Sequence, residues 1–142
     1  MGRILSIDFG RKRCGIAVTD ISRIVASGLT TVATANLEAF VLDYISRENV
    51  DLIVVGEPRD LRGLPSESQK WLRPAIEKLQ KRLPPGIPLV FYDERFTSVL
   101  AHQAMIIGGL SKKARQDKAL VDEVSATILL NDFLQSKLYS EL

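Results

Sequence analysis

Residues 3–20 have the sequence RILSIDFGRKRCGIAVTD, which predicts a strand, a tight basic turn and a second strand. Asp8 closes the first apolar run, and Gly10 and Gly15 stand on either side of the basic residues. A carboxylate at the end of an apolar strand is costly to bury unless it faces a cleft, a cation or a hydrogen-bond donor. Glycine lets another backbone pass close by. We therefore predict that Asp8 is a metal ligand and that later carboxylates of the chain come to it.

The composition is that of an ordinary globular domain: of 142 residues, 46% are hydrophobic and 25% are charged. We expect one domain that covers residues 1–142. The 19 Lys and Arg against 17 Asp and Glu give a net charge of +2, which by itself indicates no class of partner. A single cysteine excludes an internal disulfide framework, and a single histidine beside it argues against a zinc site of Cys and His ligands. A catalytic metal would need oxygen ligands.

Targeting features are missing from the sequence. No apolar run approaches the roughly 20 residues of a membrane-spanning helix. The N-terminus also lacks the order of basic, apolar and small residues that marks a secretory signal. We expect a cytoplasmic protein with no membrane partner.

The rest of the chain predicts a third strand and then alternating helices and strands. A short run at 26–32 completes three strands joined by short turns, which is typical of an antiparallel meander. The unbroken apolar run at 51–56 is typical of a strand buried on both faces, as in a parallel sheet covered by helices. We predict an α/β domain with a mixed central sheet, antiparallel over its first three strands and then parallel, flanked by helices. The other predicted elements are a helix from Leu37 with Asn36 as its N-cap, a helix around 71–79 that kinks at Pro74 or starts just before it, a strand at 88–92, a helix from Thr97 or Ser98 to Ile107, and a helix from about 119 to 134.

Three carboxylates stand at places where they could meet. Asp8 ends the first strand, Glu94 ends a later central strand, and Asp122 lies in the first turns of the last helix. Clustered carboxylates repel one another strongly, and bound Mg²⁺ or Mn²⁺ would resolve that repulsion. Two such ions roughly 4 Å apart can activate a water and stabilise the leaving oxygen of a phosphodiester. The alternative for each residue is a surface carboxylate or a helix cap.

Four segments of the sequence resemble the YqgF-type proteins, which are described as pre-16S rRNA nucleases and as Holliday junction resolvases. The resemblance runs over nearly the whole chain and implies an RNase H-like fold with metal-dependent nuclease chemistry. Carried over by position, the metal ligands and catalytic residues are Asp8, Glu94 and Asp122. The function that the resemblance favours is an endonuclease that matures the 5′ end of 16S rRNA, ahead of junction resolution. The segments are Ile7-Asp8-Phe9-Gly10 with residues 14–20, Val55-Gly56-Glu57-Pro58, residues 92–98 (YDERFTS), and residues 121–126 (VDEVSA).

The sequence departs from that family's pattern at three places. Glu57 stands where a leucine is expected, and we interpret it as a loop residue rather than an extra acidic group at the site. Residues 59–63 replace an Asn-Met-Asp-Gly-like stretch. Resolvases of the RuvC type place a second Asp one helical turn after the first, whereas position 125 is Ser here. The resemblance therefore leaves a fourth ligand open.

Basic residues stand beside each predicted ligand. If the carboxylates cluster, these cations would form a positive rim suited to a phosphate backbone. Arg95 has an equally good alternative as an ion-pair partner of Glu94, and Arg59 and Arg62 remain undecided between binding and a solvated loop. The predicted nucleic-acid-binding residues are Arg11, Lys12, Arg13, Arg95, Lys112, Lys113, Arg115 and Lys118.

The remaining candidates favour structural roles. His102 is predicted as a partly exposed helix residue, and Cys14 as an inert small hydrophobe. Trp71, Phe40 and Tyr44 are predicted to lie in the core rather than to stack on bases.

Two rival functions stay open at this point. An acetate- or sugar-kinase-like phosphotransferase also carries an Asp-x-Gly turn after its first strand, but it needs two such domains around a nucleotide. A non-catalytic nucleic-acid-binding protein on the same fold would bind without cleaving. The expected partners are pre-rRNA or branched DNA, with ribosomal particles in addition, and the expected state is a monomer or weak dimer.

Overall fold

The computed structural model describes residues 2–58, 69–94 and 117–142, with the backbone alone at residues 57, 58, 69, 93 and 94. Its strands form one five-stranded sheet in the order β3-β2-β1-β4-β5. The helix predicted from Thr97 or Ser98 lies outside the described residues. The elements in chain order are β1 (Arg3–Phe9), β2 (Arg13–Thr19), β3 (Ala26–Ala33), a short 3₁₀ turn η1 (Thr34–Asn36), α1 (Leu37–Arg47), β4 (Val50–Pro58), α2 (Gln69–Arg82), β5 (Leu89–Glu94), α5 (Lys118–Leu134) and α6 (Lys137–Ser140).

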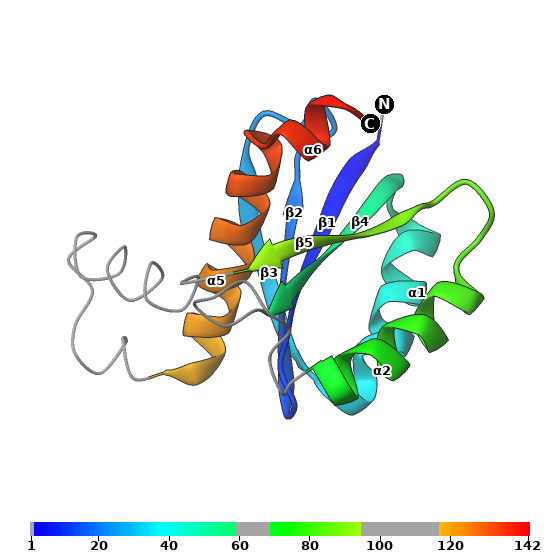
Figure 1. The fold of residues 1–142 in the computed structure, drawn as a ribbon, viewed down its shortest axis with the longest axis vertical. Coiled ribbons are helices and arrows are strands. Elements are labelled where there is room, and N and C mark those ends of the chain that lie inside the picture. The colour runs from blue at the N-terminus through cyan, green and yellow to red at the C-terminus, as the bar shows by residue number, and fades with distance from the viewer. Residues whose placement is uncertain (1, 59–68, 95–116) are drawn as a thin grey trace.

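The sheet is mixed, and its two halves follow the predicted order. β2 is antiparallel to both β1 and β3, whereas β4 is parallel to β1 and β5 is parallel to β4. The carboxyl ends of β1, β4 and β5 therefore meet at one edge of the sheet. The turn between β1 and β2 lies at this same edge (Figure 1). The predicted mixed sheet is confirmed.

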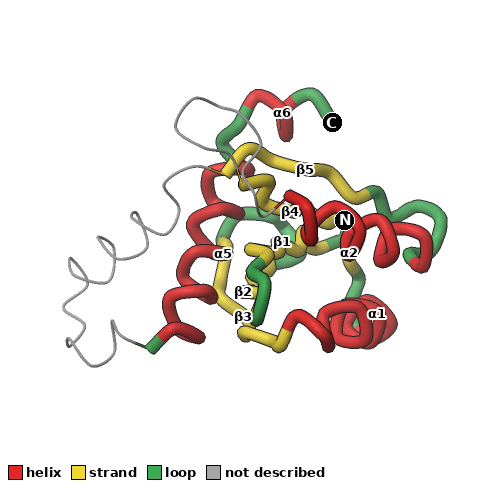
Figure 2. The backbone as a smooth tube through the Cα atoms, turned by 60° about the horizontal axis from the view of Figure 1, so that its bottom comes forward, coloured by secondary structure: helices red, strands yellow, loops and turns green. Residues whose placement is uncertain are grey.

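Helices cover both faces of the sheet. α1 and α2 lie on one face and α5 lies on the other (Figures 1 and 2). Side chains alternate along β1, so Leu5 and Ile7 belong to the core beneath α1 and α2, and Ile4 belongs to the core beneath α5. The α1/α2 core is rich in large apolar side chains, among them Val41, Ile53, Leu72, Ile76 and Leu79.

α5 approaches the sheet at two glycines. A Cβ at Gly15 would overlap the backbone carbonyl of Asp122, so this backbone-to-backbone contact exists only with glycine. A Cβ at Gly28 would lie 2.6 Å from the Oε1 atom of Glu123, which is the end of a flexible side chain. The helix therefore lies directly on β2 and reaches the edge strand β3.

Hydroxyl groups of the sheet also hold α5. The Oγ of Ser6, which is fully buried, donates a hydrogen bond of 2.9 Å to the backbone oxygen of Ala126. Thr31 Oγ1 donates one of 2.6 Å to the oxygen of Ala119. At the start of the helix, the side chain of Asp117 accepts from the amide of Ala119 at 3.0 Å, which is an N-cap. The position of α5 is thus fixed along its first half by specific polar contacts.

Two details of the predicted helices differ in the structure. Asn36 occupies the N-cap position of α1, but its side chain makes no capping hydrogen bond because η1 leads directly into the helix. α2 begins at Gln69 and contains Pro74, so the helix does not start at the proline. Pro74 is the sixth residue of α2, past its first turn, where a proline lacks the N–H group that would donate to the carbonyl four residues earlier.

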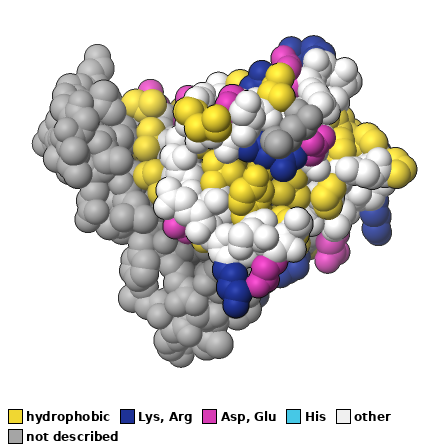
Figure 3. Space-filling view, turned by 90° about the horizontal axis from the view of Figure 1, so that it is seen from above, with side chains coloured by type: hydrophobic (Ala, Val, Ile, Leu, Met, Phe, Trp, Pro, Cys, Tyr) yellow, Lys and Arg dark blue, Asp and Glu magenta, His cyan; other side chains and the backbone are white. Residues whose placement is uncertain are grey.

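The end of the sheet opposite the β1–β2 turn is apolar in part. Hydrophobic side chains gather there among charged ones (Figure 3). Large exposed hydrophobic residues in the turn between β2 and β3 include Ile21, Ile24 and Val25. Within the described residues, no helix has the length and apolar character that crossing a membrane requires.

Candidate functional site

Asp8 and Asp122 come together around Gly15. Asp8 is the cross-strand partner of Gly15 in the β1–β2 register. The backbone of Asp122 lies against Gly15 from the α5 side. Asp8 shares that side, because alternation places it with Ile4 and Ser6, which contact the α5 layer. Gly15 thus lies between the backbones of two of the three predicted ligand residues, which are 114 positions apart in the sequence (122 − 8).

The negative charges of Asp8 and Asp122 both affect the pKa of the buried Cys14 thiol. Burial raises the pKa of Cys14 above its ordinary value of 9.0, and the negative charges of Asp8 and Asp122 raise it further. Hydrogen bonds with Thr34 and with the backbone of Gly10 act in the opposite direction. The thiol is fully buried and stays protonated at neutral pH, which agrees with the prediction of an inert small hydrophobe.

Arg13 neutralises Asp122. Its Nε lies 2.6 Å from Oδ2 of Asp122, and the two side chains are 35% and 25% exposed. Such a short, charge-assisted contact fixes the direction of the carboxylate. Because both groups remain partly solvated, the pair contributes at most about 1 kcal/mol to stability. The sequence suggested Arg13 only as a phosphate contact, and the pairing across the sheet could not be read from it.

A basic cleft of about 300 Å³ opens at this place. Four cations and one carboxylate line it, so its electrostatic potential favours an anion. Half of the predicted nucleic-acid-binding residues therefore gather here, while Arg95, Lys112, Lys113 and Arg115 lie outside the described residues. The lining residues are Gly10, Arg11, Lys12, Arg13, Lys118 and Asp122.

Thr34 holds the basic turn in place. Its Oγ1 donates a hydrogen bond of 2.6 Å to the oxygen of Gly10, and its amide donates one of 3.0 Å to the oxygen of Lys12. A Cβ at Gly10 would overlap the carbonyl of Arg13, so the turn needs a glycine there. The sequence does not mark Thr34 as a site residue, because nothing local identifies a residue that acts on a turn more than twenty positions away.

Glu94 reaches the same edge of the sheet by its backbone. It is the last residue of β5 and pairs with Pro58 at the end of β4. Glu57 lies within β4 and pairs with Asp93, so its interpretation as a loop residue is wrong, because the strand continues through Pro58. β4 in turn lies beside β1. The side chains of Glu57 and Glu94 are not described, and the other described residues contain no cluster of three metal-binding side chains. The set of Asp8, Glu94 and Asp122 therefore stays a prediction. Arg59, Arg62 and His102 lie outside the described residues.

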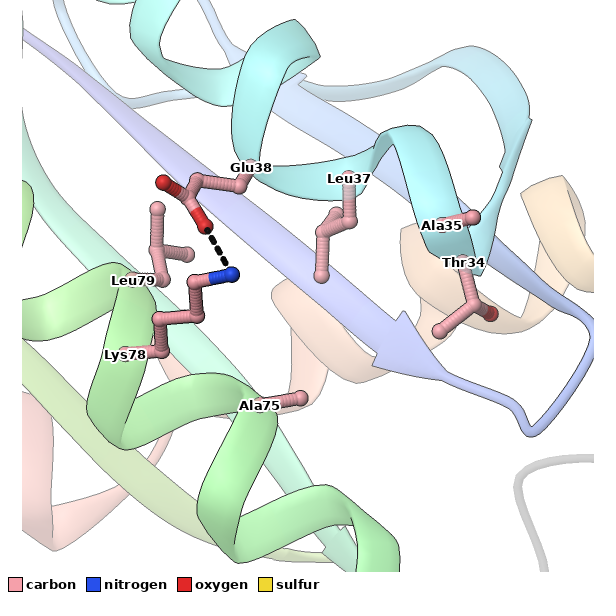
Figure 4. Close-up of a pocket in the computed structure, with 7 residues that line it drawn as sticks. All are labelled: Thr34, Ala35, Leu37, Glu38, Ala75, Lys78 and Leu79. Atoms are coloured by element: carbon pink, nitrogen blue, oxygen red, sulfur yellow. Dashed lines mark ion pairs between the residues drawn. The ribbon is translucent and has the colours of Figure 1, made fainter.

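A second hollow, of about 210 Å³, lies between α1 and α2 (Figure 4). Its carboxylate, Glu38, pairs with Arg82 at 2.9 Å and with Lys78 at 3.9 Å. The remaining lining is mostly aliphatic, so the hollow is a seam between two helices. Its lining residues are Thr34, Ala35, Leu37, Glu38, Ala75, Lys78 and Leu79.

The prediction that Trp71 lies in the core is wrong. The side chain is 40% exposed, and the guanidinium of Arg11 lies over its ring, 5.4 Å from the centroid. On a helix, residue 71 is turned about 100° from residue 72, so it falls outside the buried stripe that begins at Leu72. Phe40 and Tyr44 do pack in the α1/α2 core, with their rings stacked 6.2 Å apart.

Comparison with protein families and curated relatives gives consistent matches. Residues 2–136 match a family model described as "RuvX: Holliday junction resolvase". A relative from Phocaeicola vulgatus named "Putative pre-16S rRNA nuclease" is 55% identical over 139 residues, which cover 98% of this chain and 99% of the relative. A relative of the same name from Bacteroides fragilis is 51% identical, over 96% of this chain and 99% of the relative.

Solved structures with low sequence identity share the fold. RuvC from T. thermophilus, solved in complex with a Holliday junction substrate, superimposes with a TM-score of 0.55 at 19% identity, over 94% of each chain. A fowlpox virus resolvase in complex with Holliday junction DNA gives a TM-score of 0.57 at 16% identity, over 96% of this chain and 99% of the resolvase. These likenesses confirm the expected RNase H-like fold, in which a mixed sheet is flanked by helices.

Proposed function

The chain belongs to the RuvX family of Holliday junction resolvases, and from this premise we propose that it is a metal-dependent endonuclease that hydrolyses phosphodiester bonds of structured nucleic acid. The names of its relatives favour pre-16S rRNA as the substrate. The proposed cut is the one that matures the 5′ end of this RNA. The observation that carries the proposal is that Asp8 and the backbone of Asp122 both neighbour Gly15, and that Asp122 lines a basic cleft. A ribosomal precursor as substrate would place the protein in the cytoplasm, with ribosomal particles as partners.

The proposed metal ligands are Asp8, Glu94 and Asp122. Carboxylate oxygens are the donors that Mg²⁺ and Mn²⁺ prefer. The donor set fits such an ion, because Asp122 lines the cleft and its side chain remains 25% exposed. Glu94 ends β5 at the edge of the sheet where β1 also ends, which supports its place in the set. When bound, the metal would supply activation of a water and stabilisation of the leaving oxygen.

The basic residues of the cleft have separate tasks in this proposal. Phosphates of the substrate backbone are neutralised by three exposed side chains of the cleft, Arg11, Lys12 and Lys118. Arg13 orients the carboxylate of Asp122 through their ion pair. Thr34 keeps the turn that carries these cations rigid, through its hydrogen bonds to Gly10 and Lys12. The chain thus holds a phosphodiester above its carboxylates.

The test is a cleavage assay with Mn²⁺ or Mg²⁺ that offers an extended 16S rRNA 5′ precursor and a four-way DNA junction side by side. We expect metal-dependent cutting of the precursor, which Asp8→Asn, Glu94→Gln and Asp122→Asn each abolish because each removes a charged ligand. Asp43→Asn is the matched control, since this carboxylate lies on α1 and is 63% exposed. It should cut like the wild type.

Holliday junction resolution is the second candidate function. Two solved structures that share the fold were determined with Holliday junction DNA, which favours this alternative. If the protein cut the four-way junction and left the rRNA precursor intact, this second function would replace the first. Binding of both substrates without cutting, unchanged by Asp8→Asn, would overturn the nuclease proposal in favour of a binding protein.

A further inference from the structure

Trp71 is an exposed aromatic residue at the border of the basic cleft. It is the single tryptophan of the chain and lies in the first turn of α2. Its neighbour Leu72 is fully buried, whereas Trp71 keeps 40% of its surface exposed. Aromatic rings of this size normally bury most of their area, so a large exposed face is a candidate binding surface.

Arg11 connects this ring to the cleft. Its guanidinium lies 5.4 Å from the centre of the Trp71 ring, which is within the range of a cation–π contact. The same residue lines the cleft together with Lys12, Arg13 and Asp122. The aromatic face and the proposed cutting site are therefore bridged by one flexible, positively charged side chain.

The charges around the ring suit a nucleic acid. Lys70 precedes Trp71 in α2 and is exposed, and Arg11 is exposed as well. Every nucleobase has a π face, and stacking on aromatic side chains combined with backbone-tracking cations is the usual way in which proteins bind unpaired strands. Bases inside a duplex stack on one another, so only an unpaired base can use the face of Trp71.

We propose that Trp71 and Arg11 form a binding site for one unpaired nucleotide beside the proposed active site. The base stacks on the exposed part of the Trp71 ring, and the guanidinium of Arg11 binds the phosphate of the same nucleotide. This inference rests on the proposed nuclease function and sharpens its substrate class. The preferred substrate then carries a single-stranded segment next to the cut, and a continuous duplex is a poorer ligand.

Because Trp71 is the single tryptophan, its own fluorescence reports on the contact. The full chain is titrated without divalent metal with single-stranded RNA and DNA of about 12 nucleotides and with a blunt duplex of the same sequence. We expect saturable quenching of the tryptophan emission by the single strands and much weaker quenching by the duplex. Binding of labelled single strands, seen by fluorescence anisotropy, without any change in tryptophan emission would overturn the proposal.

Substitutions separate the contribution of stacking to the single-strand affinity from the contribution of charge. Trp71→Ala should weaken binding of labelled single strands about 5- to 150-fold, while Trp71→Phe, which keeps a ring, retains most of the affinity. Arg11→Gln should lower the slope of log affinity against log salt by about one, whereas Trp71→Ala leaves that slope unchanged. Ile24→Ala is the control, because this residue is 75% exposed at the opposite end of the sheet.

The outcomes distinguish this site from the nuclease itself. Metal-dependent cleavage by the wild type together with unchanged single-strand affinity in Trp71→Ala would overturn the stacking site alone. Quenching by single strands with no cleavage under any metal would support the stacking site and overturn the nuclease alone. Equal affinity for single strands and duplex in the wild type would also contradict the preference for unpaired nucleotides.

Discussion

The two faces of the sheet are built in different ways. Beneath α1 and α2, large aliphatic side chains such as Ile53 and Ile76 are fully buried and keep the helices at a distance from the strands. Beneath α5, Gly15 brings the helix backbone into direct contact with β2, and Ser6 binds the helix by a buried hydrogen bond. The first face is a general apolar core. The second is a specific contact that sets the position of one carboxylate.

This difference shows how the fold separates stability from the proposed chemistry. Burial of aliphatic side chains stabilises the protein but tolerates small shifts of a helix, because dispersion contacts have little directionality. A glycine contact and a buried hydroxyl restrict the distance and direction of a helix more tightly, because the first is limited by backbone contact and the second by hydrogen-bond geometry. Asp122 belongs to the helix that is fixed in this way, and Asp8 lies opposite the glycine that fixes it.

The largest expected effect on the proposed site comes from Gly15→Ala. The added methyl group overlaps the carbonyl of Asp122, so α5 must move outward, at a cost of about 1–3 kcal/mol in the free energy of unfolding. We expect Mn²⁺ binding, followed by electron paramagnetic resonance, to weaken at least about tenfold, as it does when groups that orient metal ligands are lost.

Two controls sharpen that comparison. Ile76→Ala lies on the other face and should cost more stability, about 2–5 kcal/mol, while the folded protein keeps its Mn²⁺ affinity. In Gly28→Ala the methyl group meets the side chain of Glu123, with Oε1 at 2.6 Å and Cγ at 2.7 Å, rather than backbone, so the effect on both quantities should be smaller than in Gly15→Ala. Unchanged Mn²⁺ binding in Gly15→Ala would contradict the assigned role of the close contact.

Arg13→Gln is expected to have smaller effects, and Mn²⁺ binding and cleavage should change in opposite directions. The ion pair with Asp122 is partly exposed, so urea unfolding should show a loss of less than about 1 kcal/mol. Removing the cation that competes for Asp122 should strengthen Mn²⁺ binding. Cleavage should nevertheless fall, because the carboxylate loses the partner that orients it. If Mn²⁺ affinity and cleavage fell together, Arg13 would not compete with the metal.

The smallest effect concerns Cys14 and alkaline pH. Its folded-state pKa is raised by burial above 9.0, so its contribution to stability is complete below that pH and is lost as the pH rises through the folded pKa. One proton accounts for at most about 1.4 kcal/mol per pH unit. We expect the free energy of unfolding to fall less steeply between about pH 8 and pH 10 in Cys14→Ala than in the wild type. Equal slopes would show that the thiol titrates alike in both states.

Much of the architecture could be predicted because its signals are local. Two strands are indicated by short apolar runs, one before Asp8 and one at 51–56. Glycines on either side of the basic residues mark the turn between the first two strands. The last helix spans Lys118–Leu134, which agrees with the expectation of a helix from about 119 to 134 or beyond. The position of Trp71 was wrong, because one helical step of 100° separates an exposed residue from the stripe beside it.

The candidate site also combines features that the sequence determines with features that only the tertiary structure decides. The sequence alone determined the mixed α/β sheet, the family, and which carboxylates stand at the ends of strands and in the last helix, since these depend on patterns within short segments. Only the tertiary structure decided that Asp122 meets Asp8 across Gly15, that Arg13 pairs with Asp122, and that Thr34 holds the turn. These contacts join residues far apart in the chain. Their geometry depends on how closely a helix packs on a sheet, which no local pattern records.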